Sequence, residues 1–259
     1  MTIALPAAGQ SIPPGRYRLR HAAAMEWIKL RSLRSVKLAL AAGVVAGIGL
    51  GGLIGSNTVD PHADVTNNLL ACVALVQVVF GTVGVLTVTG EYSSGTILST
   101  FAAIPDRGLV LTAKAAVFGA VALAAGEITV FGAFFAGEAA LGPRIPHPSP
   151  AQPGVLRAVV FSGAYLALIG LIGLALGAII RHGAGAVGTL VGVVFVLPAL
   201  RLSQYSAEKF FPEIIAANSL GATRPAAGQL APWAGLGVIA LYTGLLLVVA
   251  RNRLVRRDA

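Results

Sequence analysis

Long, nearly uninterrupted apolar runs dominate the chain, and strand-like alternation of apolar and polar residues is almost absent. Each run is about 17 to 25 residues long, the length that a helix needs to cross the hydrocarbon core of a bilayer. The pattern therefore predicts an all-α polytopic membrane protein with a single transmembrane domain over residues 36–250. Its six transmembrane helices are expected at about residues 36–55, 69–88, 115–136, 158–180, 184–200 and 234–250.

The segments outside these spans are predicted from their own patterns. Residues 1–20 carry three prolines and indicate a disordered lead-in. Residues 21–35 indicate an interfacial helix, and residues 251–259 form a basic tail. The loop between the fifth and sixth spans is some thirty residues long, so we expect it to have structure of its own. Apolar residues within Ser206–Ser219 predict one or two short helices in the outer leaflet there.

Composition and charge support a membrane location. Of 259 residues 56% are hydrophobic and 11% are charged, whereas soluble domains carry about 25% charged residues. Fourteen of the 19 lysines and arginines fall on the side of both termini, so the positive-inside rule predicts cytoplasmic termini. Because the basic residues flank spans and lack interleaved aromatic residues, nucleic-acid binding is not expected. A single cysteine, Cys72, excludes an internal disulfide framework, and no metal site is predicted.

The most specific segment follows the second span. Ile97, Phe101 and Ile104 recur at i, i+4 and i+7, with Leu98 beside them, which predicts a short cytoplasmic helix with one apolar stripe. Pro105 would end this helix. An exposed apolar stripe must be covered by lipid headgroups or by a protein groove, and the spacing alone leaves both open.

Two segments resemble a known family. Glu-Tyr-x-x-Gly-Thr-Ile at residues 91–97, followed by Ala-Ala-x-Pro-x-Arg at 102–107, resembles the coupling-helix loop of bacterial type-2 ABC transporter permeases. Glu-Trp-x-Lys-Leu-Arg-Ser-x-Arg-Ser at 26–35 is similar to the N-terminal interface helix of that family, and the six-span layout fits as well. The resemblance implies a multi-pass subunit in the bacterial plasma membrane. It would act as a dimer, homomeric or with a related chain, and export a hydrophobic or amphipathic compound.

The same resemblance implies that separate cytoplasmic ABC ATPase subunits drive transport and bind ATP and Mg²⁺. This chain has no Gly-x-x-x-x-Gly-Lys-Ser/Thr motif, so we expect it to bind no cofactor itself and not to be an enzyme. The interfacial helix would lie alongside the contact through Trp27, Lys29, Arg31 and Arg34. The implied ATPase-coupling residues are Glu91, Ile97, Leu98, Phe101, Ile104 and Arg107.

Glycines at i+4 spacing mark three of the spans. Small residues at this spacing allow helices to approach closely in lipid. They either pack within the chain or, by the resemblance, line the interface and route between two subunits on the first and fifth spans. The glycines are Gly43, Gly47, Gly51 and Gly55 on the first span, Gly173 and Gly177 on the fourth, and Gly188 and Gly192 on the fifth.

Glu127 is the only carboxylate well inside an apolar run. Insertion of a charge near the centre of a span costs about 3 kcal/mol, so this residue is expected either to handle substrate or protons or to make a buried hydrogen bond. An alternative function is therefore a proton-coupled secondary carrier, although no internal repeat is visible. A non-transporting, ATPase-coupled signalling subunit is a further alternative. A membrane enzyme is least favoured, because the histidines are scattered.

Overall fold

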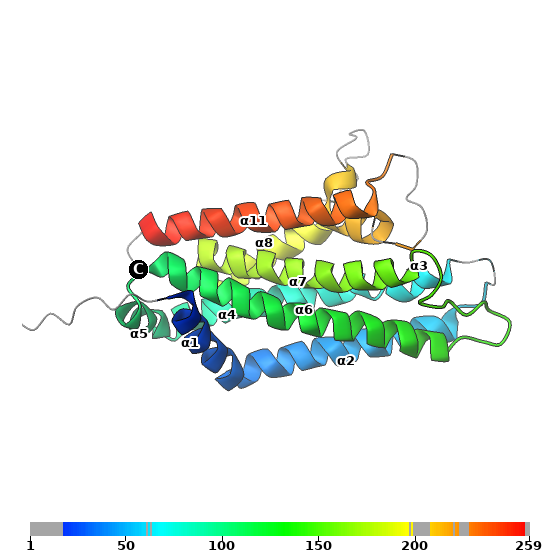
Figure 1. Cartoon of the computed structure of the whole chain (residues 1–259), viewed down its shortest axis with the longest axis horizontal. Coiled ribbons are helices and arrows are strands. Elements are labelled where there is room, and N and C mark those ends of the chain that lie inside the picture. Colours follow the sequence, from blue (N-terminus) through cyan, green and yellow to red (C-terminus); the bar gives the residue numbers. More distant parts are fainter. Residues whose placement is uncertain are drawn as a thin grey trace, which may run out of the picture.

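The computed structural model describes residues 18–60, 62, 64–196, 198, 208–219, 221–222 and 228–256, and every regular element within these ranges is helical (Figure 1). Most of the predicted disordered lead-in and much of the loop at 201–233 lie outside the described residues. Five segments are long and apolar enough to cross a membrane, which indicates a membrane protein. These segments are Arg34–Asn57, Val65–Ser93, Arg107–Ala139, Val155–Ile180 and Pro232–Arg256.

The long helices match the predicted apolar runs, but their ends differ. α2 (Arg34–Asn57) and α7 (Val155–Ile180) begin and end within about three residues of the predicted spans. The second span is divided into α3 (Val65–Leu70) and α4 (Val73–Ser93). α6 (Arg107–Ala139) begins eight residues earlier than predicted, where the Asp106 side chain accepts a hydrogen bond from the Leu109 N–H. α11 (Pro232–Arg256) continues into the predicted basic tail.

The predicted span at 184–200 is described only in its first part. Up to Val196 it is helical, as α8 (Gly183–Val191) and a π-helical turn, η1 (Gly192–Val196). Residues 197, 199 and 200 lie outside the described residues, so the full length of this span stays a prediction.

Short helices lie at the two ends of the bundle (Figure 1). α1 (Leu19–Ser32), α5 (Thr96–Ala103) and the last turns of α11 share one end, which we call the α5 end. α5 begins after Gly95, whose φ of 72° is a left-handed conformation that favours glycine. The opposite end, the α3 end, also contains η2 (Glu208–Phe210), α10 (Pro212–Ile214) and η3 (Ile215–Ser219).

α7 lies at the centre of the bundle, where it packs against α4, α6 and α11. Its contact with α4 depends on glycines: a Cβ atom added at Gly84 would collide with the carbonyl oxygen of Gly170, and one added at Gly173 with that of Gly81. Such close backbone approach is a main source of helix association in lipid. Phe80, Phe118, Phe134 and Tyr165 are among the large buried side chains of the core to which these helices contribute.

The glycine ridge of α2 faces the inside of the chain. Its four glycines are buried, and a Cβ added at Gly51 or Gly55 would collide with the carbonyl oxygen of Ala133 or Gly137 on α6. Gly43 and Gly47 face side chains of α4 and α6 in the same way. For α2 the structure therefore favours intrachain packing over an interface between subunits. On α8 and η1 the situation is different, because no atom lies within 4 Å of a Cβ added at Gly188 or Gly192.

Candidate functional site: a buried ion-pair network behind α5

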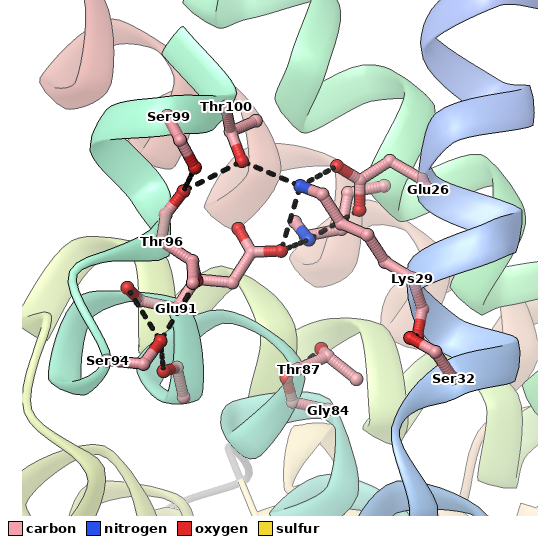
Figure 2. A network of polar contacts seen from close by, with 12 residues as sticks. Glu26, Lys29, Ser32, Gly84, Thr87, Glu91, Ser94, Thr96, Ser99 and Thr100 are labelled. Atoms are coloured by element: carbon pink, nitrogen blue, oxygen red, sulfur yellow. Dashed lines mark hydrogen bonds and ion pairs between the residues drawn. The ribbon is translucent and has the colours of Figure 1, made fainter.

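Two glutamates and two lysines meet behind α5, and Figure 2 labels Glu26, Lys29 and Glu91 among them. Glu26 and Lys29 come from α1, Glu91 from the last turn of α4, and Lys114 from α6. Lys114 Nζ lies 2.8 Å from Glu91 Oε1 and 2.5 Å from Glu26 Oε2. Lys29 Nζ lies 2.9 Å from Glu26 Oε1 and 3.1 Å from Glu91 Oε1. The four side chains thus form a closed ring of ion pairs with no net formal charge.

Thr100 connects α5 to this ring (Figure 2). Lys29 Nζ donates a hydrogen bond of 2.8 Å to Thr100 Oγ1, and that hydroxyl donates to the carbonyl oxygen of Thr96 at 3.0 Å. Thr100 is itself buried. Because the ring draws on α1, α4 and α6, α5 is connected through polar contacts to three other helices.

The ring is buried, and burial determines its energetics. The side chains of Glu26, Glu91 and Lys114 are 3%, 9% and 8% exposed, and only Lys29 reaches 26%. Removal of one partner from a buried ion pair costs about 3–5 kcal/mol, because it leaves a charge in the interior without compensation. Glu91 Oε2 is buried and accepts no hydrogen bond from any described residue. The ring therefore specifies how these helices fit together.

The apolar stripe of α5 is covered by the chain itself, which corrects part of the prediction. Ile97 and Ile104 are 7% and 4% exposed, and Ile104 packs in a cluster with Ala22 of α1 and Val110 of α6. The expectation that these two isoleucines face a partner is wrong for this conformation, because α5 folds back onto α1 and α6. Leu98, by contrast, is 60% exposed.

The remaining predicted coupling residues are divided between the interior and the surface. Phe101 is half-buried, and the guanidinium carbon of Arg107 lies 5.1 Å from its ring centroid. Arg107 also donates to the carbonyl oxygen of Leu254, which connects α6 to α11. On α1, Trp27 is half-exposed, whereas Lys29 points into the ring. Arg31 and Arg34 are exposed.

Glu127 is not part of this ring. It lies thirteen residues beyond Lys114 on α6, which is about 20 Å along the helix. Its carboxylate packs against α7, where a Cβ added at Gly163 would stand 2.6 Å from Glu127 Cδ. Glu127 Oε2 is buried and has no hydrogen-bond partner among the described residues.

A second polar arrangement lies at the α3 end. The hydroxyl of Tyr165 donates to Gln77 Oε1, and Gln77 Nε2 donates to Glu213 Oε2, both at 2.5 Å. Gln77 and Tyr165 are completely buried. Burial raises the pKa of the Glu213 carboxyl, and the hydrogen bond from Gln77 offsets part of that rise.

Two cavities adjoin α10 at this end. One, of about 610 Å³, is almost entirely apolar and opens between α7, α8 and α11; it is lined among others by Ile169, Leu190, Val194, Phe211 and Tyr242. The other, of about 350 Å³, is the more polar of the two and includes Glu213 in its wall. Two consecutive residues of α10 line different cavities: Pro212 lines the apolar cavity and Glu213 lines the polar one.

The sequence contained weak signals for the two ring members that were not predicted. Glu26 lies on the same side of its helix as the apolar Met25 and Leu33, and Lys114 stands directly at the start of an apolar run. Charged residues in such places are rarely buried unless they are paired. Glu26 and Lys114 pair with each other although they lie 88 residues apart in the chain, so only the tertiary structure reveals the pair.

Neither a scan against protein-family models nor a search of curated proteins finds a match for this chain. The functional interpretation therefore depends on the geometry of the ring and of the two cavities.

Proposed function

We propose that this chain is the membrane-spanning permease subunit of an ABC transporter, which exports a hydrophobic or amphipathic compound with energy from a separate ATPase. The observation that carries the proposal is the ion-pair ring that connects α5 to α1, α4 and α6. α5 is linked to the ring by the hydrogen bond from Lys29 to Thr100, so a push on α5 would be passed to the helices that share the ring. α5 would therefore serve as the coupling helix.

The proposed ATPase contact uses the outer surface of α5 and α1. Leu98 is 60% exposed and, on α1, Trp27 and Ile28 are 49% and 68% exposed. Apolar side chains of this size at one end of a bundle favour a protein partner or lipid headgroups as a cover. In the proposal Leu98 contacts the ATPase, while Ile97 and Ile104 hold α5 from the inside.

A sixth crossing is part of the proposal. The Arg181 guanidinium, just after α7, lies 5.3 Å from the Tyr92 ring centroid near the α5 end, whereas Glu213 bonds to Gln77 near the α3 end. The chain between these contacts must return along the bundle, which supports α8 and η1 as part of a sixth span. An even number of spans agrees with the described ends of the chain, which lie together at the α5 end (Figure 1). By the positive-inside rule this end would face the bacterial cytoplasm.

The cargo class and the second subunit follow from the open faces of the bundle. The apolar cavity of about 610 Å³ is in the size range of small-molecule sites and supports a hydrophobic or amphipathic compound as cargo. Gly188 and Gly192 have open space around them, which supports this face as the contact with a second permease subunit. ATP and Mg²⁺ would bind to the partner ATPase.

The test is purification of the tagged full chain from its native membranes, followed by measurement of co-purifying ATP hydrolysis. We expect Leu98→Asp to lower this activity at least tenfold, because a charge on the contact surface would be buried without compensation. Val255→Asp is the matched control, since Val255 is 58% exposed at the same end but lies on α11. Equal ATP hydrolysis with the two variants, or none with the unmodified chain, would contradict the proposal.

A proton-coupled carrier is the second candidate, because Glu127 Oε2 is buried without a hydrogen-bond partner among the described residues. That function predicts transport in proteoliposomes that continues without ATP and is lost in Glu127→Gln. The permease predicts transport only with the ATPase and ATP present. An ATPase-coupled signalling subunit would show no transport in either assay.

A further inference from the structure

The polar cavity at the α3 end has the properties of a binding site. It encloses about 350 Å³ between α3, α4, α7 and the segment after Pro212, a volume in the range of small-molecule sites. Its polar wall is made of two amides, one hydroxyl and one carboxylate. These side chains belong to Asn67, Asn68, Ser162 and Glu213.

Glu213 gives the cavity a negative charge. It is the only charged residue among the described residues that line the cavity. Its Oε2 is held by Gln77, which Tyr165 orients from behind, while its Oε1 accepts no hydrogen bond from a described residue. Arg157 is not a lining residue, and its guanidinium donates to backbone carbonyl oxygens, 2.9 Å from that of Gly221. A carboxylate oxygen therefore remains available to a ligand.

Ser162 provides a second polar group in the wall of the cavity. It is 4% exposed and lines the cavity, and its hydroxyl makes no hydrogen bond to a described residue. The hydroxyl oxygen is reached from the cavity, because it is not among the buried polar atoms without a partner. Since this oxygen is an acceptor, it can serve the same donor group as Glu213.

We propose that this cavity binds an ammonium group, held by Glu213 and by the Ser162 hydroxyl. An ammonium group brings one positive charge and several N–H donors, which matches one carboxylate and neutral acceptors. An anion would face Glu213, and Ca²⁺ or Mg²⁺ would require more oxygen ligands than one carboxylate and a few neutral groups. The ammonium group can belong to a free amine or to an ethanolamine lipid headgroup. The site lies at the end opposite the ion-pair ring, so binding requires no ATPase and goes beyond the proposed function.

The proposal is tested by calorimetric titration of the purified full chain, in nanodiscs of phosphatidylglycerol, with n-butylammonium chloride. We expect saturable binding that n-butanol, which is similar in size and uncharged, does not reproduce. Glu213→Gln should weaken binding at least tenfold, because it removes the charge but keeps an acceptor for Gln77. Ser162→Ala should weaken it several-fold. Asp60→Asn is the control and should bind like the unmodified chain, since Asp60 is an exposed acid after α2.

Nanodiscs that contain phosphatidylethanolamine distinguish the two sources of the ammonium group, a free amine and a lipid headgroup. If the lipid headgroup occupies the cavity, butylammonium binds more weakly in these discs than in phosphatidylglycerol, and Glu213→Gln removes the difference. If a free amine is the ligand, the affinity is the same in both lipids. Equal binding of butylammonium to Glu213→Gln and to the unmodified chain, equal binding of butanol, or no saturable binding in phosphatidylglycerol would each overturn the proposal. If Glu213→Gln fails to fold, the proposal is still tested by Ser162→Ala and by the comparison of butylammonium with butanol.

Discussion

The two ends of the bundle bury carboxylates in opposite ways. At the α5 end Glu26 and Glu91 face two lysines, and the charges cancel within the ring. At the α3 end Glu213 is held by the neutral amide of Gln77 and stands in the wall of a cavity. Charge compensation from inside the protein fixes the position of helices, whereas a buried carboxylate with only neutral neighbours is stabilised by a cation from outside. In the two proposals, the first end transmits motion between helices and the second binds a ligand.

The largest effect is expected from loss of a lysine at the α5 end. Lys114→Met leaves Glu26 and Glu91 buried with Lys29 as their only cation, so we expect a loss of about 3–5 kcal/mol in the free energy of unfolding. Thermal and denaturant unfolding in detergent measure this loss of stability. Lys37→Met, on the exposed side of α2, is the matched control and should change stability little. Similar unfolding of the two variants would show that the ring does not stabilise this end.

A smaller effect is expected at the α3 end. Gln77→Leu removes the amide between Tyr165 and Glu213 and leaves both without that hydrogen bond, at a cost of about 1–3 kcal/mol. Gln152→Leu, at an exposed position, controls for the change of residue type. If Gln77→Leu destabilised the protein more than Lys114→Met does, the proposed difference between the two ends would be reversed.

The connection between α5 and the ring can be weakened without a change of charge. Thr100→Val removes one buried hydroxyl, which accepts from Lys29, and should cost about 1 kcal/mol. Hydrogen exchange of the α5 amides should become faster, while exchange in the centre of α7 should not change. Thr112→Val is the control, because the Thr112 side chain is exposed and donates only to the carbonyl oxygen of Gly108 in its own helix. Unchanged exchange in α5 would mean that the apolar contacts of Ile97 and Ile104 are sufficient to hold it.

The sequence predicted the long helices well because apolar length is a property of one segment. Runs at 36–55 and 158–180 correspond closely to α2 and α7. The span at 184–200 begins as predicted, with α8 and η1, and its far end lies outside the described residues. The i, i+4, i+7 spacing of Ile97, Phe101 and Ile104 likewise predicted α5 but not what covers it.

The candidate site was harder to predict because its contacts join distant segments. The i+4 glycines on α2 indicated close packing, but whether α6 or a second subunit was the partner required the structure. Glu91 was selected for its place in a motif, whereas its role in the ring depends on Lys114, 23 residues away on another helix. Local patterns thus predict which elements form, and pairing between them is decided by packing.

The smallest effect concerns pH and again separates the two ends. Burial raises the pKa of Glu213, so its carboxyl keeps a proton to higher pH in the folded protein than in the unfolded one. Between the usual value of 4.5 and the raised value the folded state binds more protons, and stability must therefore fall as pH rises through this range. Glu213→Gln resembles the protonated form, so the variant should gain stability relative to the unmodified chain as pH rises from 4.5 to 8. Parallel thermal unfolding of both proteins measures the difference, and a constant difference across this range would mean that Glu213 ionises equally in the folded and unfolded states.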